Sequence, residues 1–318
     1  GVATVRDVRL EQLRDLFKPR RYVPATIQYV DIPGLKRGES AESLDLAKLK
    51  TVDALVHVVR AFADPELLHS EGSVDPARDV SNVDLELILA DLDIVGRRIE
   101  KLDKAVKRGL TPEELKEKKL LAEVILPALE AEKPLREVTL DVDDERRLRG
   151  FQLLSAKPML VVLNVDEAQV GHADATSLGI AVRPAVLTVV VSAPIEQEIS
   201  RLPPEEQKEF LADIGLSAPS LDRVTRASYD LLGQISFFTV GEDEVRAWTV
   251  RRGAHAREAA GTIHSDIERG FIRAEVVRYE DLLRLKTMAA CREAGLFRLE
   301  GKEYEMQDGD VAHFRFNV

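Results

Sequence analysis

Hydrophobic residues along the chain follow two different spacings. Continuous apolar runs rich in β-branched residues, typical of buried strands in a parallel sheet, lie at 26–30, 53–59, 157–163 and 185–191. Between these runs, residues 85–106 and 121–129 carry apolar side chains every three or four positions, which predicts amphipathic helices. From residue 233 onward, short β-rich runs separated by turns take over. The pattern therefore predicts an α/β protein with a mostly parallel, doubly wound sheet, followed by a small mixed sheet.

The two helices in the middle of the chain are predicted to form a hairpin. Gly109 suits the position just after a helix end. Thr111 and Glu114 have the spacing of a capping box, and Pro112 suits the first turn of a second helix. Two such helices joined by a short turn pair in antiparallel fashion. The hairpin either packs on the core or protrudes as an arm that meets a large partner.

Three of the predicted strands end in polar residues that could serve one site. Carboxyl ends of strands converge on one crevice in a doubly wound sheet. A carboxylate followed three residues later by glycine is the pattern beside Mg²⁺ and the γ-phosphate in P-loop NTPases, and an amide side chain can bind a purine edge. The alternative is three unrelated strand ends. The residues concerned are Asp31 with Gly34, Asn164–Glu167, and Ser192–Ala193.

Composition narrows the function classes. The chain has 318 residues, 45% of them apolar and 32% charged, which fits a soluble protein of two or three domains. Because no run of 18 apolar residues occurs, no membrane span is expected. A single cysteine, Cys291, excludes an internal disulfide and suits a reducing cytoplasm. The net charge of −11 disfavours a uniformly basic nucleic-acid binder, and no DNA partner is expected.

Several residues are open to two interpretations. The arginine-rich stretch 246–278 is either a modest footprint for RNA phosphates or a solvated mixed surface. His57, within a predicted strand, is expected to be a core residue rather than a ligand. Trp248, Phe237 and Phe238 are likewise expected in the core rather than as platforms on which bases stack.

The sequence resembles the Obg-like ATPases of the YchF type over nearly its whole length. The resemblance rests on Val30–Leu35, Asn164–Glu167, Phe237–Val250, 263–275, 299–304, 307–310 and 314–318. It implies a P-loop G domain with a coiled-coil helical insertion and a C-terminal TGS domain of β-grasp fold. The boundaries we expect are 1–65 with 150–232 for the G domain, 66–149 for the insertion, and 233–318 for the TGS domain.

The resemblance also implies a cytoplasmic, ribosome-associated enzyme that hydrolyses ATP in preference to GTP with Mg²⁺. It further implies contacts with rRNA, either on the large ribosomal subunit or on the assembled ribosome. The sequence indicates neither the oligomeric state nor a catalytic residue. The alternatives are a non-catalytic module that docks on ribosomes or another protein, and a metabolic α/β enzyme. The second of these is disfavoured because no nucleophile–base pair or metal cluster is evident.

The resemblance assigns roles to individual residues. Asp31 would hold Mg²⁺ through water, and Gly34 would face the γ-phosphate. The adenine would be flanked by Asn164, Val165 and Glu167, and its pocket closed by Ser192 and Ala193. Guanine-specific relatives carry Asp at the position of Glu167, so the longer side chain should remove the guanine preference.

Three features concern the phosphate side of the site, and the last two of them depart from the family pattern. Leu35 stands where Ras-like enzymes carry a catalytic glutamine, so hydrolysis is expected to be slow or to need another group. The Walker A loop is absent from this sequence, and we expect it upstream of Gly1. The usual glycine-rich second switch is replaced by Lys36–Ser43.

Overall fold

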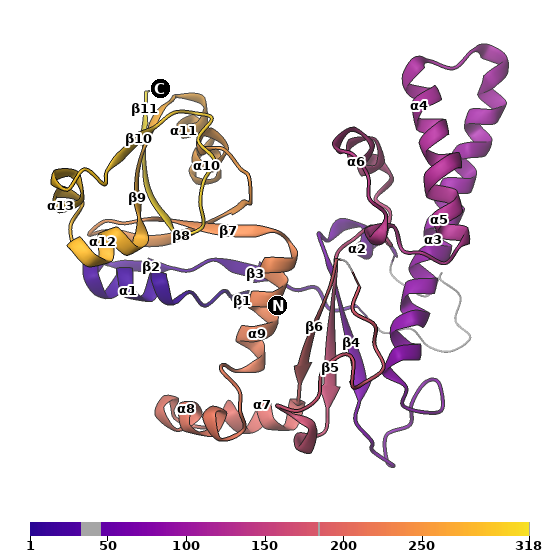
Figure 1. Cartoon of the computed structure of the whole chain (residues 1–318), viewed down its shortest axis with the longest axis horizontal. Helices are drawn as coiled ribbons and strands as arrows, with labels where there is room; N and C mark the ends of the chain where they lie inside the picture. Colours follow the sequence, from indigo (N-terminus) through magenta and orange to yellow (C-terminus); the bar gives the residue numbers. More distant parts are fainter. Residues whose placement is uncertain (33–45, 184, 318) are drawn as a thin grey trace. The chain divides into compact units, whose positions relative to one another are not determined.

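The computed structural model describes residues 1–32, 46–183 and 185–317 (Figure 1). The chain divides into two compact units. One unit combines Gly1–Val30 with Thr225–Val318, and the other spans Asp31–Val224. The helix α9 (Ser220–Leu231) contributes residues to both.

The unit Asp31–Val224 is built on a parallel sheet in the order β4 (Leu55–Ala61), β5 (Met159–Val165), β6 (Val186–Val191). The central strand β5 is buried along its length except at Asn164. A strand covered on both faces needs apolar residues at every position, which explains the continuous run in the sequence. The predicted α/β class with a parallel sheet is confirmed.

Helices cover this sheet and enclose two apolar clusters. Val80 and Leu87 of α3 (Pro76–Ala105) pack on β4 and β5. The second cluster joins Val165 of β5 to α7 and α8. Outside the hairpin, the unit also contains the helices α2 (Leu46–Thr51), α6 (Val142–Leu148), α7 (Ala193–Ile199) and α8 (Pro204–Asp213). It has 3₁₀ turns at Val106–Arg108, Leu135–Glu137, Arg149–Phe151 and Glu167–Gln169.

The predicted helical hairpin is present and extends beyond the sheet within its unit (Figure 1). Its second arm comprises α4 (Pro112–Leu120), a π turn (Leu121–Ile125) and α5 (Leu126–Glu130). Its seam buries apolar residues of both arms: Ile88, Val95, Leu102, Leu121, Ile125 and Leu129.

The start of the second arm and its π turn follow from local sequence. Thr111 accepts the Glu114 N–H at 3.2 Å, and Glu114 accepts the Thr111 N–H at 2.9 Å, so the predicted capping box is confirmed. Pro127 has no N–H, and its ring would clash with the carbonyl group four residues earlier. The chain therefore widens to π spacing just before it.

Two buried carboxylates on α3 hold the hairpin to the sheet. Asp91 is 0% exposed and accepts the backbone N–H groups of Leu154 and Ser155, each at 2.8 Å. Two helical turns earlier, Asp84 accepts hydrogen bonds from Arg136 and Arg183. These bonds link α3 to the segments that return from the hairpin and lead into β5 and β6.

The other unit contains a six-stranded sheet in the order β10–β9–β11–β7–β8–β2 and the antiparallel pair β1–β3. In the large sheet β11 and β7, and β2 and β8, run parallel, whereas the other neighbours are antiparallel. The strands are β1 (Val2–Thr4), β2 (Arg21–Val23), β3 (Thr26–Gln28), β7 (Gln234–Thr239), β8 (Glu244–Arg251), β9 (Phe271–Arg278), β10 (Arg298–Glu300) and β11 (Asp310–Phe316).

Both faces of this sheet are covered. Successive residues point to opposite faces, so Phe237 and Phe238 belong to different clusters. Phe238 packs with Leu10 and Leu13 of α1, and Phe237 packs with alanines of α10. The helices are α1 (Val8–Phe17), α10 (Ala256–Ile263), α11 (Ser265–Arg269), α12 (Tyr279–Leu285) and α13 (Met288–Glu293).

The N-terminal segment lies elsewhere than we expected. Residues 1–30 were expected in the G domain, but they pack with the C-terminal sheet. The strand β2 adds to that sheet beside β8. Arg9 bridges Asp7 at 2.8 Å and Asp308 at 2.9 Å, and its guanidinium lies over Phe238. The apolar spacing of α1 predicts a buried face but does not say which sheet covers it.

Replacing Asp91 with alanine should lower the free energy of unfolding by about 3 kcal/mol, because two buried N–H groups lose their acceptor. Urea unfolding at pH 7 measures this. Asp93→Ala is the matched control, since Asp93 is exposed on the same helix and, among the described residues, pairs with Arg97 one turn later. An exposed pair of this kind contributes at most about 0.5 kcal/mol. Equal losses in the two variants would contradict the anchoring role of Asp91.

His57 should make the protein sensitive to mild acid. Burial lowers the pKa of His57 against the opposing attraction of Asp84 and Asp79, and Nδ1 has no hydrogen-bond partner in the described ranges. The unfolded chain therefore takes up a proton at about pH 6.5, above the folded pKa, so stability falls as the pH drops below that value. Urea unfolding between pH 7.5 and 5 should show a shallower decline for His57→Leu than for the wild type. Parallel curves would be inconsistent with a neutral buried imidazole.

Candidate functional site

The carboxyl ends of β5 and β6 meet through the side chain of Asn164. In the parallel register Asn164 lies opposite Val191, directly before Ser192 and Ala193. The Ala193 N–H donates to Asn164 Oδ1 at 3.1 Å. Ala193 opens α7, so its N–H has no partner within the helix and needs an outside acceptor. The structure thus brings together two of the three predicted strand ends.

The residues around this contact differ in solvent exposure and in hydrogen bonding. Val165 is 1% exposed and packs with Ile195 and Ile199, so its side chain points away from any ligand at the strand end. Glu167 is exposed in the 3₁₀ turn that follows β5. Ser192 is 2% exposed, and its hydroxyl group has no hydrogen-bond partner among the residues described.

Asp166 is a structural residue of this site that our sequence analysis did not single out. Its carboxylate accepts the Gln169 N–H while Gln169 Oε1 accepts the Asp166 N–H at 3.3 Å. It also accepts the Ala63 N–H, just beyond β4, at 3.4 Å. Asp166 therefore fixes the turn that carries Glu167 and links the ends of β4 and β5. The Asp-x-x-Gln spacing is a capping-box signal that could have identified it.

The third predicted strand end follows a strand of another pair. Asp31 is exposed and follows β3, whose partner is β1 rather than the sheet of β4, β5 and β6. Gly34 and Leu35 lie outside the described residues. In the part of the chain that the structure describes, no three His, Cys, Asp or Glu side chains gather as a metal site. A single carboxylate still suits Mg²⁺, which is usually held by one or two carboxylates, phosphate oxygens and water.

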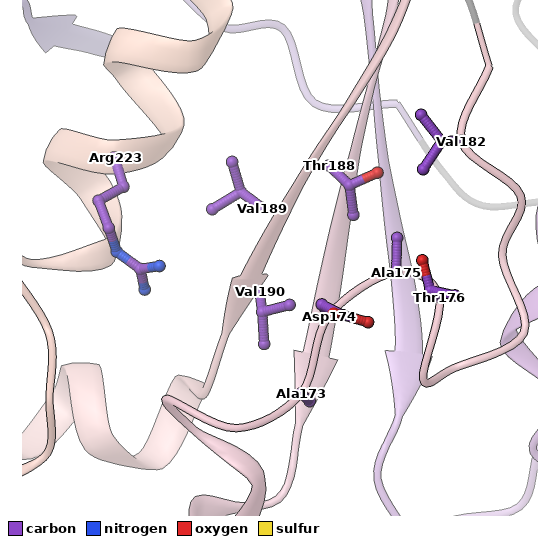
Figure 2. Close-up of a pocket in the computed structure, with 9 residues that line it drawn as sticks. All are labelled: Ala173, Asp174, Ala175, Thr176, Val182, Thr188, Val189, Val190 and Arg223. Atoms are coloured by element: carbon purple, nitrogen blue, oxygen red, sulfur yellow. The ribbon is translucent and has the colours of Figure 1, made fainter.

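A separate groove opens beside β6 (Figure 2). Its volume is about 510 Å³, and it is lined by Thr188–Val190, by 173–176 with Val182, and by Arg223 of α9. Figure 2 shows Arg223 extending toward Val190. Arg223 donates to Ser220 Oγ at 2.9 Å, and burial lowers its pKa. Of the proposed nucleotide-binding residues that the structure describes, none lines this groove.

Fold and site together define an α/β protein with a polar contact at the joined ends of two parallel strands, a helical hairpin and a C-terminal sheet unit. Over the described residues, no helix is both long and apolar enough to cross a membrane. A family model named for the C-terminal part of YchF GTPases, described as "Protein of unknown function (DUF933)", matches residues 234–317.

Known proteins match the whole chain. The ribosome-binding ATPase YchF of Bacillus subtilis is 44% identical over 100% of this chain and 89% of its own length. The Haemophilus influenzae protein of the same name is 43% identical with the same coverage. The structure of the Schizosaccharomyces pombe YchF GTPase superposes with a TM-score of 0.87 at 33% identity, covering 99% of this chain and 86% of that one. The chain belongs to the YchF family.

Removing the Asn164 side chain should expose the Ala193 amide. In Asn164→Ala the N–H loses its acceptor, and its hydrogen exchange should accelerate about fivefold, the equivalent of one ordinary hydrogen bond. Asn164→Asp keeps an acceptor at the same place and should retain protection. Amide exchange followed by NMR tests both variants. Unchanged exchange in Asn164→Ala would show that the contact does not hold the start of α7.

Proposed function

We propose that this chain acts as a ribosome-associated NTPase that binds ATP with Mg²⁺ in preference to GTP. The observation that carries the proposal is the hydrogen bond between Asn164 and the Ala193 amide at the carboxyl edge of the parallel sheet. Ligands of open α/β sheets bind outside this edge. Relatives that match the whole chain are named ribosome-binding ATPases, which supports both parts of the proposal.

The base would lie at the joined ends of β5 and β6. Asn164 would present its amide beside the purine, and the turn held by Asp166 would present Glu167. Because the side chain of Val165 is buried, only its backbone could contribute. The hydroxyl of Ser192, which has no hydrogen-bond partner within the described residues, and the backbone of Ala193 would close the pocket.

On the phosphate side, Asp31 would hold Mg²⁺ and Gly34 would approach the γ-phosphate. The charge of a bound nucleotide and its Mg²⁺ would order the chain segments around it, as in other nucleotide switches. The helical hairpin and the C-terminal unit would be the parts that meet the ribosome. Such a protein would work in the cytoplasm.

The base preference can be tested by calorimetry with Mg²⁺-ATP and Mg²⁺-GTP. The wild type should prefer ATP, and Glu167→Asp should raise GTP affinity relative to ATP by about tenfold, the contribution of a charge-assisted hydrogen bond to the base. Glu198→Asp makes the same chemical change at an exposed position of α7 and should leave the preference unaltered. If Glu167→Asp also leaves it unaltered, the assignment of the base pocket fails.

A second candidate function is a non-catalytic module that docks on ribosomes or another protein. The hairpin favours it, because one apolar seam leaves the polar faces of both arms free for a partner. The same calorimetry separates the two functions. Cosedimentation with ribosomes in the absence of any nucleotide binding would support the module and overturn the NTPase.

A further inference from the structure

A ladder of flat groups runs from the core of the C-terminal sheet to its surface. Phe314 meets Phe237 edge-on at 5.8 Å, and Phe237 stacks on Trp248 at 6.5 Å with the rings 16° from parallel. The guanidinium of Arg246 lies 3.9 Å from the centre of the Trp248 ring. The outermost member of this ladder is therefore a planar cation.

Strand register explains why the ladder reaches the surface. Arg246 and Trp248 are two residues apart on β8 and share a face, and they lie opposite Thr239 and Phe237 of β7. Thr239 Oγ1 accepts the Trp248 indole N–H at 2.9 Å, which fixes the ring. The alanines of α10 pack with Phe237, whereas Trp248 and Arg246 stay half-buried. Trp248 was expected in the core, and the structure places it at the edge of the core instead.

The charge of Arg246 is only loosely neutralised. Its recorded ion pair, with Glu244, is 3.9 Å long, and the Arg246 side chain is 36% exposed. Glu244 also pairs with Arg21 of the neighbouring strand β2 at 3.6 Å, so two arginines share one carboxylate. Arg21 is 72% exposed. The surface beside the ladder therefore presents two arginines with exposed side-chain area on adjacent strands.

We propose that the stack of Arg246 on Trp248 is a binding site for an unpaired base of single-stranded RNA. The base would add to the ladder by stacking on the guanidinium, and Arg21 would face the adjoining phosphates. Stacking on a flat cation or an aromatic ring tolerates any base, and a phosphate backbone needs exposed positive charge. The choice of RNA as partner rests on the proposed ribosome association, whereas the stacking site itself rests on the geometry of β8.

Intrinsic tryptophan fluorescence reports on this site alone, because Trp248 is the single tryptophan of the chain. The full chain would be titrated with a 12-mer of oligouridine, with an RNA duplex of the same length, and with UMP, while tryptophan fluorescence is recorded. The single strand should quench the fluorescence, and the duplex should not, because its bases are already stacked. Equal binding of the duplex, or equal binding of UMP, would overturn the assignment to single-stranded RNA.

Variants separate stacking from charge. Arg246→Lys keeps the charge but loses the plane, so anisotropy with labelled oligouridine should show about tenfold weaker binding with unchanged salt dependence. Arg252→Lys, at an exposed position just beyond β8, should bind like the wild type. Trp248→Phe keeps a ring under Arg246 and should bind RNA without the fluorescence signal. If Arg246→Lys binds as tightly as the wild type, the site is refuted.

This test uses RNA alone and therefore does not depend on ribosomes or nucleotide. Thermal unfolding of each variant shows whether the fold is intact. Loss of ribosome cosedimentation with normal oligouridine binding would count against the proposed function only. Normal cosedimentation without oligouridine binding would overturn only the stacking site.

Discussion

The position of α3 is fixed by the buried carboxylate of Asp91. This one helix contributes to two apolar clusters. Val80 and Leu87 cover the parallel sheet, and Val95 and Leu102 form part of the hairpin seam. A carboxylate without water must be fully hydrogen-bonded, and the two N–H groups ahead of β5 meet that need only at one axial position of the helix. Sliding α3 by a turn would leave Asp91 unsatisfied and would shift the hairpin and the sheet together. The axial position of α3, set by Asp91, therefore fixes both the hairpin and its packing on the sheet that carries Asn164.

In the other unit, Arg9 has a comparable task. It joins Asp7 at the start of α1 to Asp308 in the turn before β11, and Asp308 in turn accepts the Ser236 N–H at 2.9 Å. The neighbouring Gly309 has a φ of +90°, and a Cβ there would lie 2.9 Å from the Arg9 guanidinium. Glycine is therefore required twice over, for its backbone conformation and for the space it leaves. One cation thereby holds the N-terminal helix, the last turn of the sheet and strand β7 in place.

Sequence reasoning succeeded where the information is local. The parallel strands at 53–59, 157–163 and 185–191, the hairpin and the capping box at Thr111 each depend on residues a few positions apart, and they are confirmed. The run at 26–30 instead forms β3, which pairs antiparallel with β1. Sequence reasoning failed for residues 1–30, because the apolar face of α1 fits either sheet and only Arg9 and strand β2 decide between them. Trp248 packs against the core but at its edge, and a strand pattern does not show where a covering helix stops. At the candidate site, the proximity of Asn164 and Ala193 was predictable from the edge of a parallel sheet, whereas the position of Asp31 remains a prediction.

The pairing of β2 with β8 has a consequence for how the polypeptide is made. More than two hundred residues separate these strands, and the whole of Asp31–Val224 lies between them. During synthesis the intervening unit can fold as soon as it emerges, because its contacts are contained within one continuous stretch. Strand β2 has no neighbour in the large sheet until β8 has been made, so closing that long loop comes late. Until then Leu10 and Leu13 of α1 lack the sheet that buries them, and the nascent chain carries an exposed apolar segment that chaperones can recognise.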